Sequence, residues 1–103
     1  MRKSFVFIYD PNFIDFRNLD AFLNSNPAIL NWIRPVISSA VIIVSDRDLP
    51  ELNQTLHAHM GQHLYLLLET SGSLSDGWMP YNVWDFIRTT PTRWDQIFLP
   101  PQS

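Results

Sequence analysis

Two stretches of the chain are apolar at almost every position, which is the composition of buried strands. Residues 5–9 read Phe-Val-Phe-Ile-Tyr, and residues 40–44 read Ala-Val-Ile-Ile-Val. A strand that is covered on both faces loses the alternation of polar and apolar residues that a half-exposed strand shows. The pattern therefore predicts two central strands of one sheet.

Two further stretches predict strands of a different kind. Residues 29–36 mix apolar and polar side chains, and Pro35 stands near their end. Because proline cannot donate a backbone hydrogen bond, a strand that contains it usually lies at the edge of a sheet. Residues 63–69, which read His-Leu-Tyr-Leu-Leu-Leu-Glu, form the last clear strand. The chain thus offers four strands, of which one has the features of an edge.

Apolar residues recur at helical spacing in two segments between these strands. In the first segment, which starts near Asp15, the apolar positions are Phe16, Leu19, Phe22 and Leu23. In the second, Asp48 is a good N-cap, Pro50 suits the first turn and Gly61 suits the end of the helix. Spacings of three and four place the apolar residues on one buried helix face. Residues 81–88 predict a third, short helix.

The order strand, helix, strand, strand, helix, strand predicts an α+β fold of ferredoxin-like βαββαβ architecture. Right-handed crossovers would place the four strands in one antiparallel sheet with two helices on one face. We expect residues 1–88 to form this single domain and residues 89–103 to be a C-terminal aromatic tail. The other sheet face would be bare. We expect the alternating aromatic residues of the first strand, with Tyr65 and Leu67, to be exposed there until the C-terminal segment or a second subunit covers them.

Composition narrows the classes of function. The absence of cysteine excludes disulfides, thiolate zinc sites and cysteine nucleophiles. The net charge is −3, and the seven basic residues are dispersed, which disfavours nucleic acid as a partner because phosphate binding requires several cations. No apolar run is long enough to span a membrane, and residues 5–9 are too short for a signal-peptide core. We therefore expect a cytoplasmic protein with no membrane partner.

Three stretches resemble known families of small bacterial proteins. Phe7-Ile8-Tyr9-Asp10 resembles the strand ending in Tyr-Asp of the small CRISPR adaptation subunits and of VapD-type toxins. Residues 31–35 and 38–44, followed by residues 48–52 and 63–69, resemble the SinR-like family in the same order, with Gly77-Trp78 and Trp84 near its Gly/Trp segment and terminal helix. The resemblance covers roughly residues 4–88. It implies a ferredoxin-like domain of bacterial or mobile-element origin that dimerises through its sheet.

Asp10 is the one residue to which this resemblance assigns chemistry. In the CRISPR and VapD-type relatives, the Asp that closes the first strand is paired across the dimer and binds a divalent metal for RNA or DNA cleavage. Two copies of Asp10 would suit Mg²⁺ or Mn²⁺, which prefer oxygen ligands. The alternative is structural, because Asp10-Pro11-Asn12 also reads as a turn in which the Asp side chain accepts backbone N–H groups.

Histidines and a second acidic group have simpler interpretations. His57 and His59 are two residues apart and point away from each other on a helix, and Gly61 interrupts the spacing from His59 to His63. We expect them to be surface histidines near a helix end and not a zinc site. The acidic residues Asp46, Asp48 and Glu51 are explained by the start of the same helix.

Aromatic residues gather in the C-terminal third of the chain. Those we expect to contact a partner are Trp78, Tyr81, Trp84, Trp94 and Phe98. They have three interpretations: filling of the bare sheet face, protein contact, or stacking on nucleic-acid bases. The leading hypothesis is a homodimeric interaction or regulatory module that needs no cofactor. The alternative is a Mg²⁺- or Mn²⁺-dependent endoribonuclease with paired Asp10 carboxylates, and a small-ligand sensor is a third class.

Overall fold

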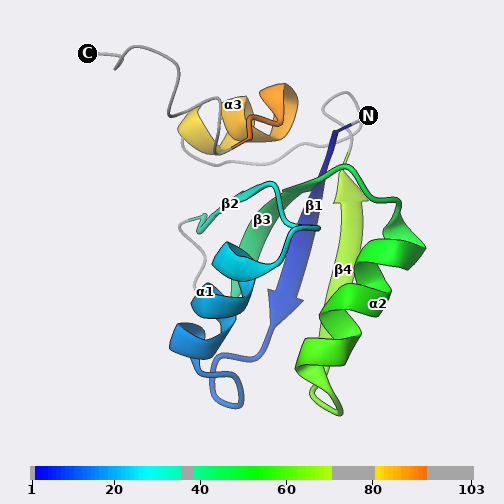
Figure 1. Cartoon of the computed structure of the whole chain (residues 1–103). Coiled ribbons are helices and arrows are strands. Elements are labelled where there is room, and N and C mark those ends of the chain that lie inside the picture. The colour runs from blue at the N-terminus through cyan, green and yellow to red at the C-terminus, as the bar shows by residue number, and fades with distance from the viewer. Residues whose placement is uncertain (1, 36–38, 71–80, 93–103) are drawn as a thin grey trace.

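The computed structural model describes residues 2–35, 39–70 and 81–92 of the chain (Figure 1). Within these residues, four strands and three helices alternate. Their bounds are β1 (Lys3–Tyr9), α1 (Phe16–Ser25), β2 (Asn31–Ile33), β3 (Ala40–Ser45), α2 (Leu49–Met60), β4 (Tyr65–Thr70) and α3 (Tyr81–Thr89). The predicted α+β class is confirmed. In the described residues, no helix has both the length and the apolar character needed to cross a membrane.

The strands form one antiparallel sheet in the order β2-β3-β1-β4. The two apolar stretches are therefore its central strands, as their composition predicts. β4 pairs with β1 without interruption from Ser4 opposite Thr70 to Tyr9 opposite Tyr65. The strand expected over residues 29–36 is shorter in the structure: β2 covers only Asn31–Ile33 and lies at the edge.

Local signals explain where the helices begin and end. The side chain of Asp15 accepts the N–H of Arg17, and Oδ1 of Asp48 accepts the N–H of Glu51 at 3.1 Å, so α1 and α2 each have an acceptor for one of their first free donors. Gly61 ends α2 with a φ of 63°, a conformation that favours glycine, and its N–H donates to the carbonyl of His57.

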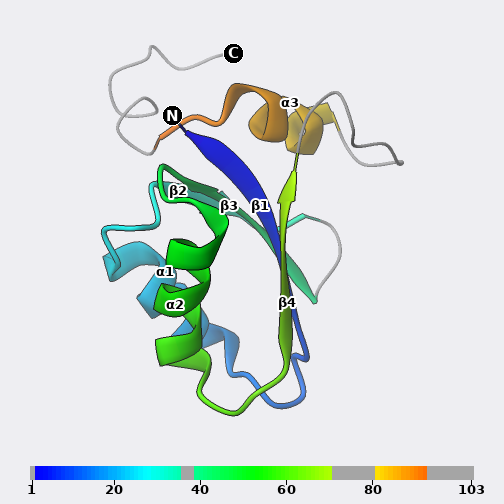
Figure 2. The same ribbon diagram turned by 90° about the vertical axis from the view of Figure 1, so that its right-hand side faces the viewer.

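Helices α1 and α2 cover the same face of the sheet (Figure 2). The core between them includes Phe5, Phe7 and Tyr9 of β1, and Tyr65 and Leu67 of β4 pack against it. The expectation that these aromatic residues face the bare side is therefore wrong. Residues 5–9 are apolar at every position, so their pattern does not say which alternate set faces the helices. In the structure, Phe5, Phe7 and Tyr9 face the helices, because these larger side chains supply more apolar area to the two-helix layer.

The opposite face of the sheet is covered at one end by α3 (Figures 1 and 2). Val83, Phe86 and Ile87 pack on Ile42 and Val44 of β3. Polar anchors hold this layer to the sheet: the hydroxyl of Ser4 donates to the carbonyl of Ile87 at 3.2 Å, and Nδ2 of Asn31 donates to the carbonyl of Pro91 at 3.1 Å. The side-chain oxygens of Ser4 and Thr70 also share a hydrogen bond. The predicted third helix is thus present and covers one end of this sheet face.

Candidate interaction surface

Away from α3, the same sheet face presents exposed apolar side chains. Leu66 lies opposite Ile8, and Leu68 lies opposite Val6, so these residues share the face that α1 and α2 leave free. Ile8, Leu66 and Leu68 are 36%, 52% and 46% exposed, and Leu64, just before β4, is 88% exposed. We call Ile8, Leu64, Leu66 and Leu68 the open-face strip. Apolar residues that cluster on a surface in this way usually mark a contact site.

The strip borders a shallow hollow of about 430 Å³. Its lining is mostly apolar and comes largely from one end of the β1–β4 pair, where β1 ends and β4 begins: Ile8, Tyr9, Asp10, Pro11, Ser39, Leu64, Tyr65 and Leu66. A second hollow of about 460 Å³ lies between α2 and β4, and its lining is Leu49, Pro50, Asn53, Tyr65, Leu66 and Leu67. Small-molecule sites usually enclose most of their ligand. Open hollows beside exposed leucines suit the side chains of a protein partner better.

The outer edge of β4 adds unpaired backbone groups to this surface. β4 pairs with β1 on one side, and no strand lies on its other side in the part of the chain that the structure describes. Exposed edges tend to pair with other strands unless proline, lysine, a bulge or a covering segment prevents it. β4 contains neither proline nor lysine, and its register with β1 has no bulge. The open-face strip therefore runs along a strand that is itself able to pair.

Asp10 lies in the turn that follows β1 and is exposed. Its Oδ1 accepts the N–H of Asn12 at 2.9 Å, and its carbonyl accepts the N–H groups of Phe13 and Ile14 at 3.1 and 3.2 Å. This is the structural interpretation of Asp10-Pro11-Asn12, in which the carboxylate shapes the turn. Among residues 2–35, 39–70 and 81–92, no three His, Asp or Glu residues are grouped to hold a metal ion. A metal shared between two copies of Asp10 stays a prediction.

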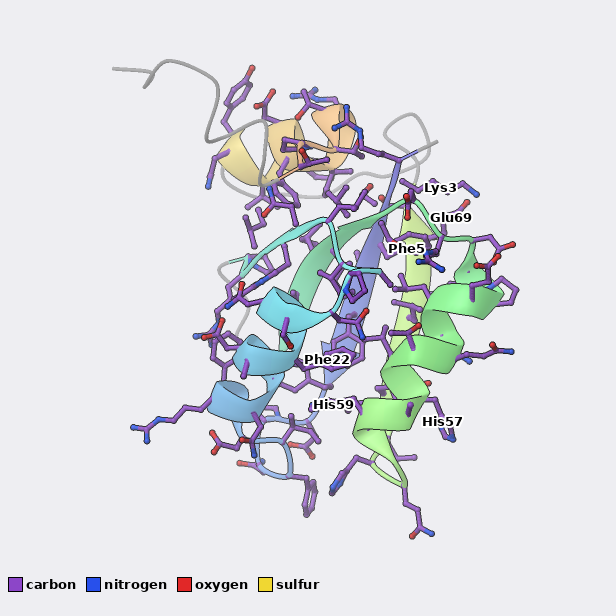
Figure 3. The ribbon with its side chains drawn as sticks, in the orientation of Figure 1. Lys3, Phe5, Phe22, His57, His59 and Glu69 are labelled. Carbon is purple, nitrogen blue, oxygen red and sulfur yellow. The ribbon has the colours of Figure 1, made fainter. Side chains whose placement is uncertain are left out.

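The three histidines contact different parts of the molecule. The His59 ring stacks on Phe22 with their centroids 4.3 Å apart, so it links α2 to α1 (Figure 3). The His57 ring lies 6.4 Å from that of Tyr65 in a tilted arrangement. His63 lines a small hollow of about 230 Å³ together with Asp10 and Phe13. Each histidine is exposed, in agreement with the expectation of surface positions.

The predicted aromatic contact residues fall into three groups. Tyr81 is 77% exposed at the start of α3, and its ring lies 5.9 Å from the Arg88 guanidinium. Trp84 is partly buried against the sheet cluster beneath α3, so it helps to cover the sheet. Trp78, Trp94 and Phe98 lie outside the described residues. The division of the chain at residue 88 stays a prediction. The helix α3 itself continues to Thr89.

Two tyrosines beside the strip have altered acidity. Burial raises the pKa of Tyr9 above its usual 10.0, and the positive charge of Arg34 partly opposes that increase. Burial also raises the pKa of Tyr65, whose hydroxyl donates to Oδ1 of Asn53 at 2.5 Å. Both side chains are therefore neutral phenols at physiological pH and contribute hydrogen-bonding and apolar contact rather than charge.

Sequence reasoning did not find the open-face strip. Residues 64–68 are apolar without a break, and that pattern is typical of a strand covered on both faces. A weak signal was present in residues 5–9, where Phe5, Phe7 and Tyr9 alternate with the smaller Val6 and Ile8. The larger set faces the helix layer, and the smaller set lies on the open face, where Ile8 is part of the strip.

Comparison with known proteins identifies no relative: no family model, no curated protein and no solved structure matches the chain. The functional conclusion therefore rests on the geometry of the described residues.

Proposed function

We propose that the chain is a small homodimeric interaction module of regulatory type, and that the uncovered sheet face is its contact surface. The observation that supports this proposal is the open-face strip, in which four apolar side chains, from β1, from β4 and from the residue just before β4, are exposed together. Fully burying a Leu or Ile side chain contributes roughly 1.5–3 kcal/mol, so covering such a strip favours association. The proposal requires no cofactor.

The strand order supports a ferredoxin-like architecture for this module. In β2-β3-β1-β4, each neighbouring pair is antiparallel, and the two helices that follow β1 and β3 lie on one face. This is the arrangement expected of two βαβ units whose strands interleave. A fold of this kind supports many unrelated functions, so the argument for interaction depends on the surface and not on the architecture.

Charge at the strip is consistent with contact between proteins. β4 contains one charged residue, Glu69, and its carboxylate lies 3.4 Å from the ammonium group of Lys3. Each copy therefore brings only one charged residue of β4 to such an interface, and that residue is already paired within its own chain. The aromatic segment of residues 89–103 is proposed to extend the contact surface. Removal of that segment should then weaken association, as measured by the mass of the truncated chain in solution.

A charge placed in the strip tests the proposal. Leu66→Lys introduces an ammonium group at the most exposed strip residue within β4, where lysine is also a natural deterrent to strand pairing. Asn18→Lys is the matched control, because it adds the same charge at an exposed position of α1, the helix that contacts the opposite edge strand, β2. Light scattering after size exclusion should give a dimer mass for the control and the chain mass of 12.0 kDa for Leu66→Lys. Equal masses for the two variants would contradict the proposal.

A further inference from the structure

The two edges of the sheet differ in how well they are protected. β2 has three residues, and Arg34 and Pro35 follow it directly. The Asn31 side chain of β2 accepts the N–H of Trp32 and donates to the carbonyl of Pro91, so both of its polar atoms already have partners. Short length, charge and proline are the usual means of preventing edge pairing. β4 has twice as many residues and no proline, and its one charged residue, Glu69, is paired with Lys3, so it is the edge available for another strand.

The sequence of β4 also suits pairing with itself. In an antiparallel pair, residues directly opposite each other have side chains on the same face, so one residue must stand opposite its own copy, with the two-fold axis midway between them. We call this an axis through that residue. An axis through Leu67 places Leu66 opposite Leu68 of the second copy, Leu67 opposite itself, and Tyr65 opposite Glu69. Every leucine then meets a leucine, and each Glu69 enters with its charge already balanced by Lys3.

Neighbouring registers are less favourable. An axis through Leu68 would place Glu69 opposite Leu67, and Leu66 opposite Thr70, which removes two of the apolar pairs. An axis through Leu66 would require residues 62–64 to extend the strand, although the chain is a turn at residues 61–63 and β4 begins only at Tyr65. The register centred on Leu67 thus keeps five residues of each strand paired and places leucine opposite leucine at the three central positions.

Space on both sides of β4 accommodates a second strand. On the helix side, the hollow of about 460 Å³ is lined by Leu49, Pro50 and Asn53 of α2 and by β4 itself. On the other side, Leu66 of each copy would lie beside Leu68 of the other, so the two open-face strips would cover each other in part and join into one apolar band. An interface of this kind is isologous, because the same residues contribute from each copy, and it closes at two subunits.

We propose that two copies of this chain associate edge to edge, through antiparallel pairing of β4 with β4 about a two-fold axis at Leu67, to form one continuous eight-stranded sheet. This inference rests on the proposed function and specifies how its two copies meet. Main-chain hydrogen bonds along the two edges would supply affinity, and the leucine pairs would fix the register.

Single cysteines locate the axis, because the natural chain has none. Only the residue on the axis lies opposite its own copy, at a Cβ separation of about 4.5–5.5 Å, whereas the adjacent residues Leu66 and Leu68, on the other face, meet their own copies diagonally at about 7–8 Å. Disulfides need Cβ atoms about 3.5–4.5 Å apart, so the axial cysteine reacts after the smallest adjustment. We expect Leu67→Cys, under mild oxidation, to shift from 12.0 kDa to twice that mass on a non-reducing gel, and Leu66→Cys and Leu68→Cys to remain at 12.0 kDa.

Mixing Leu66→Cys with Leu68→Cys gives a second test that leaves the partly buried Leu67 intact. These residues are opposite each other across the proposed axis, so a size-tagged Leu66→Cys chain should cross-link to an untagged Leu68→Cys chain and to no other. Self-linking of Leu66→Cys or Leu68→Cys would overturn the edge-to-edge register, and so would the absence of cross-links in every variant while the wild-type chain is dimeric. Neither result would contradict the proposed function. A wild-type chain that is monomeric at all concentrations would overturn both.

Discussion

Substitution of two adjacent strand residues tests which face of the sheet is the core. Phe7 is fully buried, and its ring lies 5.6 Å from the rings of both Tyr9 and Tyr65. Ile8 follows it in the sequence, points to the opposite face and is 36% exposed. If the aromatic set forms the core, shortening Phe7 must destabilise the chain much more than shortening Ile8.

The expected magnitudes follow from burial. Phe7→Ala removes a ring from a closed core and should lower the free energy of unfolding by about 3–5 kcal/mol. Ile8→Ala should cost about 1–2 kcal/mol, since a buried Ile→Ala change costs about 2–5 kcal/mol and part of Ile8 is already in water. With a slope of about 1–2 kcal/mol per molar urea, the difference between the two variants is on the order of 1–3 M in midpoint.

Urea unfolding followed by tryptophan fluorescence measures this difference, at a protein concentration low enough to avoid association. Phe7→Leu provides a milder variant in case Phe7→Ala does not fold, and it should shift the midpoint in the same direction by less. An Ile8→Ala variant as unstable as Phe7→Ala would refute the reasoning, because it would mean that the smaller alternate set is the core.

Three other predictions concern the cap of α2, the buried tyrosines and Asp10. Asp48→Ala should lower the free energy of unfolding, measured by urea titration, by about 1 kcal/mol, because it removes the acceptor for the Glu51 N–H. The control Asp46→Ala removes only an exposed ion pair with Arg47 and should change that free energy by about 0.5 kcal/mol or less. Burial raises the pKa of Tyr9 and Tyr65 above the unfolded value of 10.0, so their contribution to stability is fully present below that pH and is lost as pH rises through the raised pKa values. The urea midpoint should therefore be lower at about pH 11 than at about pH 8, and equal midpoints would contradict this prediction. With Mg²⁺ or Mn²⁺ added, the wild-type chain and Asp10→Ala should leave RNA and DNA equally intact; cleavage by the wild type alone would support the endoribonuclease alternative.

Much of the fold was predictable because its signals are local. The N-cap Asp48 and the terminal Gly61 determine the ends of α2 within the sequence itself. The two continuous apolar stretches indicated central strands, and the sheet places them there. The helix expected over residues 81–88 is α3, which buries Ile87.

The open-face strip was not predictable by the same means. A run of five apolar residues reads identically whether its odd or even positions face the helices, so the orientation of β1 depends on which set fills the core better. The exposure of Leu66 and Leu68 depends on β4 lying at an edge and on α3 covering only one end of that face. Both are consequences of tertiary packing. The contact residues placed at Trp78, Trp94 and Phe98 lie outside the described residues and stay predictions.

Sedimentation equilibrium of the unmodified chain tests the central claim most directly. If the uncovered sheet face joins two copies, the weight-average mass should increase with concentration from 12.0 kDa toward twice that value and then stop, because a two-fold interface closes at the dimer. A mass that stays at 12.0 kDa over the whole concentration range would contradict the account, as would a mass that continues to rise beyond the dimer.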